Sequence, residues 1–200
     1  MNNLTKIFTV SMKPLLVLVT LFTCLPAIAS WQLDNNDSMI SFISTKKTNI
    51  SEVHHFKELK GSIRADGEAT VTIDLASVNT GIAIRDERMQ SLLFQTELFA
   101  SAEFSATLSN KFLDELVVGE STELMLMGRL SLHGQAQSLQ VPTYVTKLSD
   151  KKLLVVSIKP VILNVADFAL VEGVLKLQEI AKLPSISTAV PVNFVLTFTR

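Results

Sequence analysis

Apolar and polar residues alternate along most of this chain with a period of two. In the stretch 123–134, leucines occupy one set of alternate positions, while Met125 and Met127 stand on the opposite face. The last stretch is similar, with apolar residues at every second position from Val190 to Phe198 and Val195 as the exception. A period of two is that of a half-buried β-strand. The pattern predicts strands at 39–46, 59–65, 71–75, 102–108, 124–133, 141–147, 152–163 and 190–199.

Turn residues separate several of these strands. The segments ADGEA (65–69) and LSDKK (148–152) are typical of hairpin loops, because Gly, Asp and Ser favour tight turns. About eight strands at hairpin spacing favour an antiparallel barrel or sandwich.

Two stretches depart from the alternation and predict short helices. The first is 86–93, with Asp86 as N-cap and Glu87 in the first turn, where the helix dipole favours an acid. The second is 170–183, where Leu170, Val174 and Leu177 form an apolar stripe and Pro184 ends the helix. The expected architecture is thus a β-structure with two short helical inserts.

The N-terminal segment has the features of a secretory signal peptide. Lys6 and Lys13 precede an uncharged apolar run that closes with Ala-Ile-Ala at 27–29. The run 15–25 is short for a transmembrane helix, which needs about 20 apolar residues. We therefore predict cleavage after Ala29, a domain at 30–200 and no transmembrane span after cleavage. Cys24, the one cysteine, would be removed with this segment.

Charge and motifs narrow the function classes. The formal net charge is −1 and no long run of basic residues occurs, which argues against a nucleic-acid partner. The predicted domain has no thiol, no G-x-S-x-G, no P-loop, no G-x-G-x-x-G and no H-E-x-x-H. His54 and His55 would point to opposite faces of a strand, so they predict solvated or loop histidines rather than metal ligands. The interpretation is a non-enzyme without cofactor or metal.

The four charged residues at 85–88, Arg-Asp-Glu-Arg, allow two interpretations. They can be the polar start of a helix with its charges in water. Alternatively, Arg85 can turn inward at the junction of strand and helix, to bind a ligand's polar end or to hold the helix against the barrel. The residues alone favour the solvated helix start; between the two inward roles of Arg85, holding the fold is slightly favoured over binding a ligand.

These residues also carry a family resemblance. The stretch 71–108 resembles the signature of the YceI-like family, with Ser77, Thr80-Gly81 and Arg85-Asp86 followed by a short helix, an aromatic-rich segment and a strand near EFSATL. The segments WQLDNNDSMISF and GRLSLHGQAQSLQVPTYV resemble its first strand and a later hairpin. The resemblance implies an all-β, lipocalin-like antiparallel barrel of eight strands, exported to the periplasm. It further implies a long-chain lipid or isoprenoid ligand in an elongated apolar cavity. Asn164 stands where relatives usually carry arginine, which puts a charged head-group contact there in doubt.

The leading hypothesis is therefore a periplasmic carrier or scavenger of an isoprenoid-like ligand. Met125 and Met127 could also line its cavity, since methionine adapts to irregular ligands. The candidate ligand-binding residues at the wall and mouth are Phe42, Arg85, Asp86, Phe94, Phe99, Phe104, Phe168 and Phe194.

Two alternatives use the same residues differently. A partner-binding module would employ the 170–183 helix or an exposed strand edge, and a second copy of the chain could be the partner. A hydrolase or isomerase acting on a lipid would use Arg85, Asp86 and His133, and it ranks last.

Overall fold

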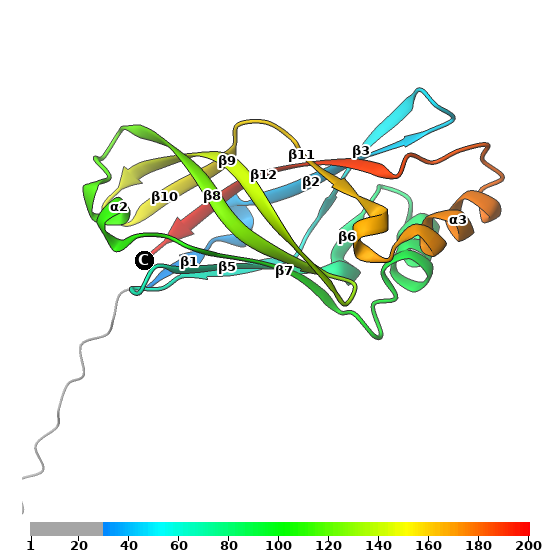
Figure 1. Ribbon diagram of the computed structural model, residues 1–200, viewed down its shortest axis with the longest axis horizontal. Helices are drawn as coiled ribbons and strands as arrows, with labels where there is room; N and C mark the ends of the chain where they lie inside the picture. Colours follow the sequence, from blue (N-terminus) through cyan, green and yellow to red (C-terminus); the bar gives the residue numbers. More distant parts are fainter. Residues whose placement is uncertain (1–29) are drawn as a thin grey trace, which may run out of the picture.

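The computed structural model of this chain describes residues 30–200, so the predicted signal peptide lies outside the described residues. The strands form an elongated antiparallel barrel (Figure 1). They are β1 (Trp31–Leu33), β2 (Met39–Lys46), β3 (Ile50–Phe56), β4 (Leu59–Ile63), β5 (Glu68–Asp74), β6 (Val78–Asn79), β7 (Ser101–Thr107), β8 (Ser121–Leu132), β9 (Gln135–Ser149), β10 (Lys152–Ser157), β11 (Val161–Asn164) and β12 (Ala189–Thr199).

The barrel closes through the last strand. The hydrogen-bonded order is β1, β4, β5, β7, β8, β9, β10 and β12, and β12 pairs back to β1. β2 continues β1 beyond the short 3-10 turn η1 (Asn35–Asp37), because both strands pair with β12. β11 continues β10 on the same strand β12. The prediction of an all-β, eight-stranded antiparallel barrel is confirmed.

The alternation decides which side chains face the interior. On β8, Leu124, Leu126 and Leu130 line the interior. Met125 and Met127 are 50% and 59% exposed on the outer face. The expectation that these two methionines could line the cavity is therefore wrong, because their positions in the two-residue period place them on the leucines' opposite face.

Two strand predictions need correction. β3 was not among the predicted strands, because SEVHHF lacks a clear apolar alternation. The predicted strand 152–163 is two strands, interrupted at 158–160, where Pro160 has no N–H to donate to a ladder. Because β3 pairs with β2 along its whole length, it forms a hairpin that extends past the barrel, in cyan and blue in Figure 1.

The first helix begins earlier than predicted. α1 (Ala83–Arg88) has Ile82 as its N-cap, with no side-chain hydrogen bond to the helix start. Asp86, the predicted N-cap, lies within the helix, and its carboxylate accepts a hydrogen bond from the Thr80 backbone N–H at 2.8 Å. The chain continues into a π-helical turn, η3 (Met89–Phe94), that ends at Gln95 in the left-handed region, φ 50°.

The second predicted helix is α3 (Val171–Ile180), which packs against η3. Val174 and Leu170 are buried there, so the apolar stripe is covered largely within the chain. Gly173 permits this contact, since a Cβ would lie 2.7 Å from the Leu93 Cα and 2.8 Å from the Leu92 carbonyl oxygen.

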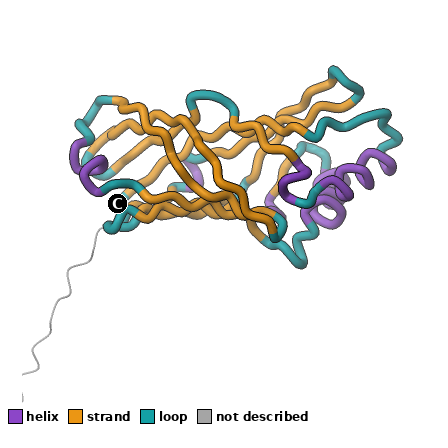
Figure 2. The backbone as a smooth tube through the Cα atoms, in the orientation of Figure 1, coloured by secondary structure: helices purple, strands orange, loops and turns teal. Residues whose placement is uncertain are grey.

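A further helix, α2 (Asn110–Glu115), corrects the expectation of two helical inserts. The Ser109 hydroxyl caps it by accepting a hydrogen bond from the Phe112 N–H at 3.1 Å. α2 lies at one end of the barrel, and α3 lies at the other with most of the remaining helical segments (Figures 1 and 2). Among residues 30–200, no helix has the length and apolar character needed to cross a membrane.

Candidate ligand-binding cavity

The barrel encloses an elongated cavity rather than a filled core. Its larger part has a volume of about 480 Å³ and its smaller part about 150 Å³. Both parts share five apolar residues, and we call this shared ring the neck: Ile40, Ile73, Leu130, Leu163 and Val192. The two parts therefore lie next to each other along the barrel, on either side of the neck.

The smaller part is apolar throughout. Its wall includes Phe104, Phe194 and Phe198, together with leucines, isoleucines and valines from the barrel strands. Leu113 of α2 also belongs to this wall, and the neighbouring Leu116 is buried in the same core cluster. α2 therefore closes this end with apolar side chains.

The larger part lies between the barrel and the helices. Met89, Leu93 and Phe94 contribute from α1–η3, while Val174 and Leu177 contribute from α3. Phe42 and Phe56 continue the apolar wall along β2 and β3, with their ring centroids 5.4 Å apart. The helices thus form a roof over an apolar chamber.

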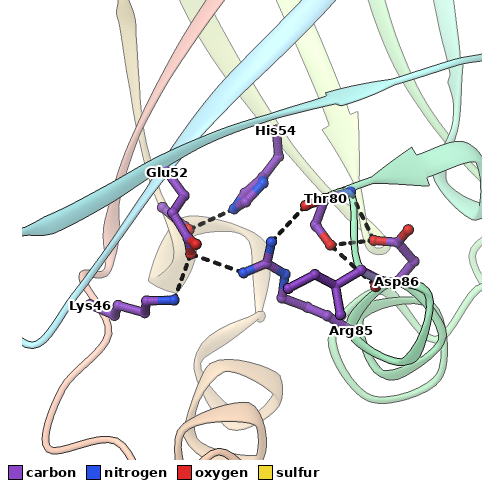
Figure 3. Close-up of polar contacts among 8 residues, drawn as sticks. Lys46, Glu52, His54, Thr80, Arg85 and Asp86 are labelled. Carbon is purple, nitrogen blue, oxygen red and sulfur yellow. Dashed lines mark hydrogen bonds and ion pairs between the residues drawn. The ribbon is translucent and has the colours of Figure 1, made fainter.

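Charged side chains gather on one side of this chamber (Figure 3). The Glu52 Oε2 atom accepts hydrogen bonds from Lys46 Nζ at 2.7 Å and from Arg85 Nη1 at 2.9 Å. Arg85 Nη2 also donates to the Thr80 backbone oxygen at 2.7 Å. Because β2, β3 and α1 each supply one charge, this network joins the β2–β3 hairpin to the helical roof.

The network holds Glu52 ionised. The Lys46 hydrogen bond is the largest cause of a lowered Glu52 pKa; partial burial opposes the shift, and the charge of Arg85 adds to it. A carboxylate that accepts two charged hydrogen bonds favours its ionised form.

His54 lies beside this network and faces inward. Its side chain is only 2% exposed, and its Nε2 is 2.9 Å from the Ser44 hydroxyl oxygen. Burial lowers the His54 pKa, and the positive charge of Arg85 lowers it further. The prediction of a solvated or loop histidine is therefore wrong for His54, because the inward register of β3 places it in the chamber wall.

The structure distributes the predicted ligand-binding residues unevenly. Phe42, Phe94, Phe168 and Arg85 line the larger part, and Phe104 and Phe194 line the smaller part. Which of these residues touch a ligand stays a prediction.

Phe99 and Asp86 are not part of either wall. The Phe99 ring packs on His133 instead, with centroids 4.3 Å apart, and Asp86 holds Thr80. Asn164 does line the larger part, and its side chain caps the 3-10 turn η4 (Val165–Phe168) by accepting from the Ala166 N–H. No group of three or more His, Cys, Asp or Glu residues suited to a metal was found within 30–200.

Sequence reasoning missed Lys46, Glu52 and His54 as members of the site. They were missed because β3 was not predicted as a strand. Its pairing with β2 places Glu52 opposite Ser44 and His54 opposite Phe42. The HH pair in 51–58 was the available clue, because one of two adjacent strand residues must face inward.

Comparisons with known proteins agree with this architecture. The family described as "YceI-like domain" matches residues 31–198. A polyisoprenoid-binding domain from Saccharophagus degradans, described as implicated in plant cell wall breakdown, is 37% identical. It covers 84% of this chain and 97% of its own, with a TM-score of 0.83.

More distant solved structures share the fold. BcnA of Burkholderia cenocepacia is 20% identical, covering 82% of this chain and 98% of its own, with a TM-score of 0.63. The YCEI protein of Campylobacter jejuni is 16% identical, covering 74% and 84%, with a TM-score of 0.53. No curated protein sequence gave a significant match. The closed barrel, its helical roof and the match over nearly the whole described chain lead to one conclusion: this chain belongs to the YceI-like family.

Proposed function

We propose that this chain binds one long-chain apolar or amphiphilic ligand, isoprenoid-like in character, inside the barrel and serves as its carrier or scavenger. The observation that carries the proposal is the pair of adjacent, largely apolar cavities inside the barrel and under its roof, with volumes of about 150 and 480 Å³. The 37% identical relative is named for polyisoprenoid binding, which supports the same ligand class and a binding role rather than catalysis.

The energetics of an apolar tail are sufficient. One five-carbon prenyl unit contributes roughly 3–4 kcal/mol when buried, at about 0.8 kcal/mol per methylene-sized group. Association costs on the order of 4–15 kcal/mol. Several buried units still leave the ~8 kcal/mol that micromolar affinity requires. The tail can therefore drive binding, and polar contacts are needed only to orient the head.

The test is direct detection of a co-purified ligand. The protein is purified from its natural host, and native mass spectrometry together with solvent extraction identifies bound lipid. Leu130→Trp fills the neck, so we expect this variant to lose the ligand. Met127→Trp is the matched control, because the same side chain on the outer face of β8 leaves the cavity unchanged.

Each outcome has a definite meaning. Lipid in wild type and M127W, absent from a folded L130W, supports the proposal. Wild type that neither carries lipid nor takes up geranylgeraniol from solution contradicts it. Circular dichroism establishes that the tryptophan variants are folded.

We also propose export to the periplasm with removal of residues 1–29. The basic flank, short apolar run and Ala-Ile-Ala end of that segment support this proposal. Cell fractionation and the mass of the mature protein test it. A chain that begins at Ser30 in the periplasmic fraction is expected, and an uncleaved cytoplasmic chain would contradict it.

A further inference from the structure

Cationic side chains outnumber carboxylates in the wall of the larger chamber. Its wall contains the cationic groups of Lys46, Arg85 and Arg88 but only one carboxylate, that of Glu52. Lys46 and Arg85 already share the Glu52 Oε2 atom. Since His54 is buried and its pKa is lowered by that burial, its ring adds no further charge near neutral pH. The chamber wall therefore has an excess of positive charge.

Among these three cations, Arg88 is the one that forms no ion pair within residues 30–200. It is half-buried. Its neighbour Glu87 is exposed, and adjacent residues on a helix do not face each other. Arg85 and Arg88 stand three residues apart in α1, which places them on one face of the helix.

Two buried polar atoms in the same wall also have no partner within the described protein. They are Nδ1 of His54 and Nε of Arg85. His54 is only 2% exposed. Buried polar atoms are usually hydrogen-bonded, and leaving one unpaired costs about 1–3 kcal/mol. Unpaired atoms in a cavity wall that Arg88 also lines indicate that a polar group from a ligand belongs there.

We propose that this side of the chamber binds the head group of the ligand, and that this head group presents an oxygen acceptor: a carbonyl, a carboxylate or a phosphate. Arg88 is the principal contact, with Arg85 and His54 beside it. This inference rests on the proposed function, because the tail must occupy the apolar cavity for the head to reach this wall.

The charge of the wall selects among head groups. Guanidinium is donor-only, and its planar fork matches carboxylate and phosphate oxygens. A cationic amine would meet like charge in a chamber of low dielectric, which is unfavourable. An alcohol can accept one hydrogen bond but offers no charge. The expected order of affinity is anionic acceptor, then neutral carbonyl, then alcohol, then amine.

The test varies the head and keeps the tail. Delipidated protein is titrated with geranylgeranoic acid, its methyl ester, geranylgeraniol and geranylgeranylamine, with binding followed by calorimetry. We expect the acid to bind wild type about tenfold more tightly than the alcohol, as for a hydrogen bond between charged groups. Geranylgeranyl monophosphate distinguishes a phosphate site from a carboxylate site.

Arg88→Gln should abolish most of the acid's advantage while leaving the affinity for geranylgeraniol within about twofold, the error of such comparisons. Arg129→Gln is the matched control, since Arg129 is exposed on the outer face of β8. Glu52→Gln is a second variant in the opposite direction: it releases Lys46 and Arg85 from their carboxylate and should increase the acid's advantage.

The outcomes separate the two proposals. If all four ligands bind wild type equally, or the amine binds best, the head-group site is wrong while the cavity proposal stands. If R88Q and R129Q behave alike, Arg88 is not the contact. If no ligand binds, the proposed function itself fails. If the ester and the acid both bind wild type more tightly than the alcohol, and R88Q loses this difference, the result supports a neutral carbonyl as the natural head group.

Discussion

At the scale of single residues, the structure divides the charges of Arg-Asp-Glu-Arg among different roles. Arg85 donates to Glu52 and to the Thr80 backbone oxygen, and Asp86 accepts from Thr80. These contacts fix the start of α1 against β3 and the preceding turn. The role in the fold that the sequence slightly favoured for Arg85 is therefore supported by geometry, while Arg88 is the residue with capacity left for a ligand.

Arg85→Gln tests the role in the fold. The variant removes two charged hydrogen bonds and leaves Glu52 with Lys46 alone, so we expect a loss of about 1–2 kcal/mol in the free energy of unfolding. Urea unfolding followed by circular dichroism measures it. Arg88→Gln, which breaks no ion pair within 30–200, should unfold like wild type. Equal stability of R85Q and wild type would contradict the assignment.

His54 predicts a pH dependence of stability. Burial lowers its folded pKa below the ordinary value of about 6.5, so the unfolded chain binds a proton more readily. The stabilising effect of the neutral ring is present above that value and is lost as pH falls through it towards the folded pKa. Wild type should therefore lose more stability than His54→Gln between about pH 7.5 and about pH 5.

Urea unfolding at several pH values makes this measurement. His55→Gln is the matched control, since it removes the adjacent histidine, which lies on the other face of β3 and is not part of the chamber wall. Parallel pH profiles for wild type and H54Q would show that His54 protonates as easily in the folded protein as in the unfolded chain.

At the scale of elements, the roof of the cavity depends on the close contact of α3 with η3. Gly173 allows this contact, because a Cβ there would lie 2.7 Å from a backbone atom of Leu93. Gly128 has the same role in the barrel wall, where a Cβ would overlap the Phe104 ring. Small residues at these two positions let the roof and an aromatic wall residue approach their neighbours.

Gly173→Ala should separate α3 from η3. The added methyl group meets backbone atoms, which cannot rotate away, so we expect a net loss of about 1–2 kcal/mol despite alanine's better helix propensity. Thermal and urea unfolding measure the loss. Glu172→Ala, at the exposed neighbouring position, should stay within about 0.5 kcal/mol of wild type. A G173A variant as stable as E172A would mean that the contact is looser than described.

At the scale of the whole molecule, the barrel has two apolar core clusters whose residues also line the two parts of the cavity. A ligand that fills this cavity therefore stabilises the folded state. A ligand that binds only the folded state stabilises it by about 2.7 kcal/mol when present at a hundred times its dissociation constant.

We therefore expect extraction of the natural ligand to lower the melting temperature, and geranylgeraniol in such excess to raise it by about 5–10 °C. Differential scanning calorimetry measures both. L130W, with its neck filled, should not respond. A melting temperature unchanged by extraction and by added ligand would contradict a ligand-filled barrel. Light scattering on the same samples tests whether a second copy of the chain is a partner.

The alternation of the long strands was enough to predict an antiparallel β-fold and its inward face, while the choice of a barrel over a sandwich came from the family resemblance. On β12 the period of two places Val192, Phe194 and Leu196 in the cavity wall, because successive strand residues must point to opposite sides. Long, regular strands can be recognised in this way from local pattern alone. The sequence also predicted correctly that the charges at 85–88 lie at a helix, although the helix begins at Ala83 and not at Asp86.

Which charged side chains contact one another depends on how segments distant in the sequence pack together. Glu52 and Arg85 are 33 positions apart in sequence, and their ion pair depends on how the hairpin of β2 and β3 lies against α1. The irregular pattern of β3 hid this strand, and with it Glu52, His54 and the ion pair between Glu52 and Lys46 of β2. Whether an inward side chain fills a core or borders a cavity depends on the spacing of all the strands together. Local sequence fixes the direction of each side chain, whereas the closure of the barrel and its roof fixes the space into which it points.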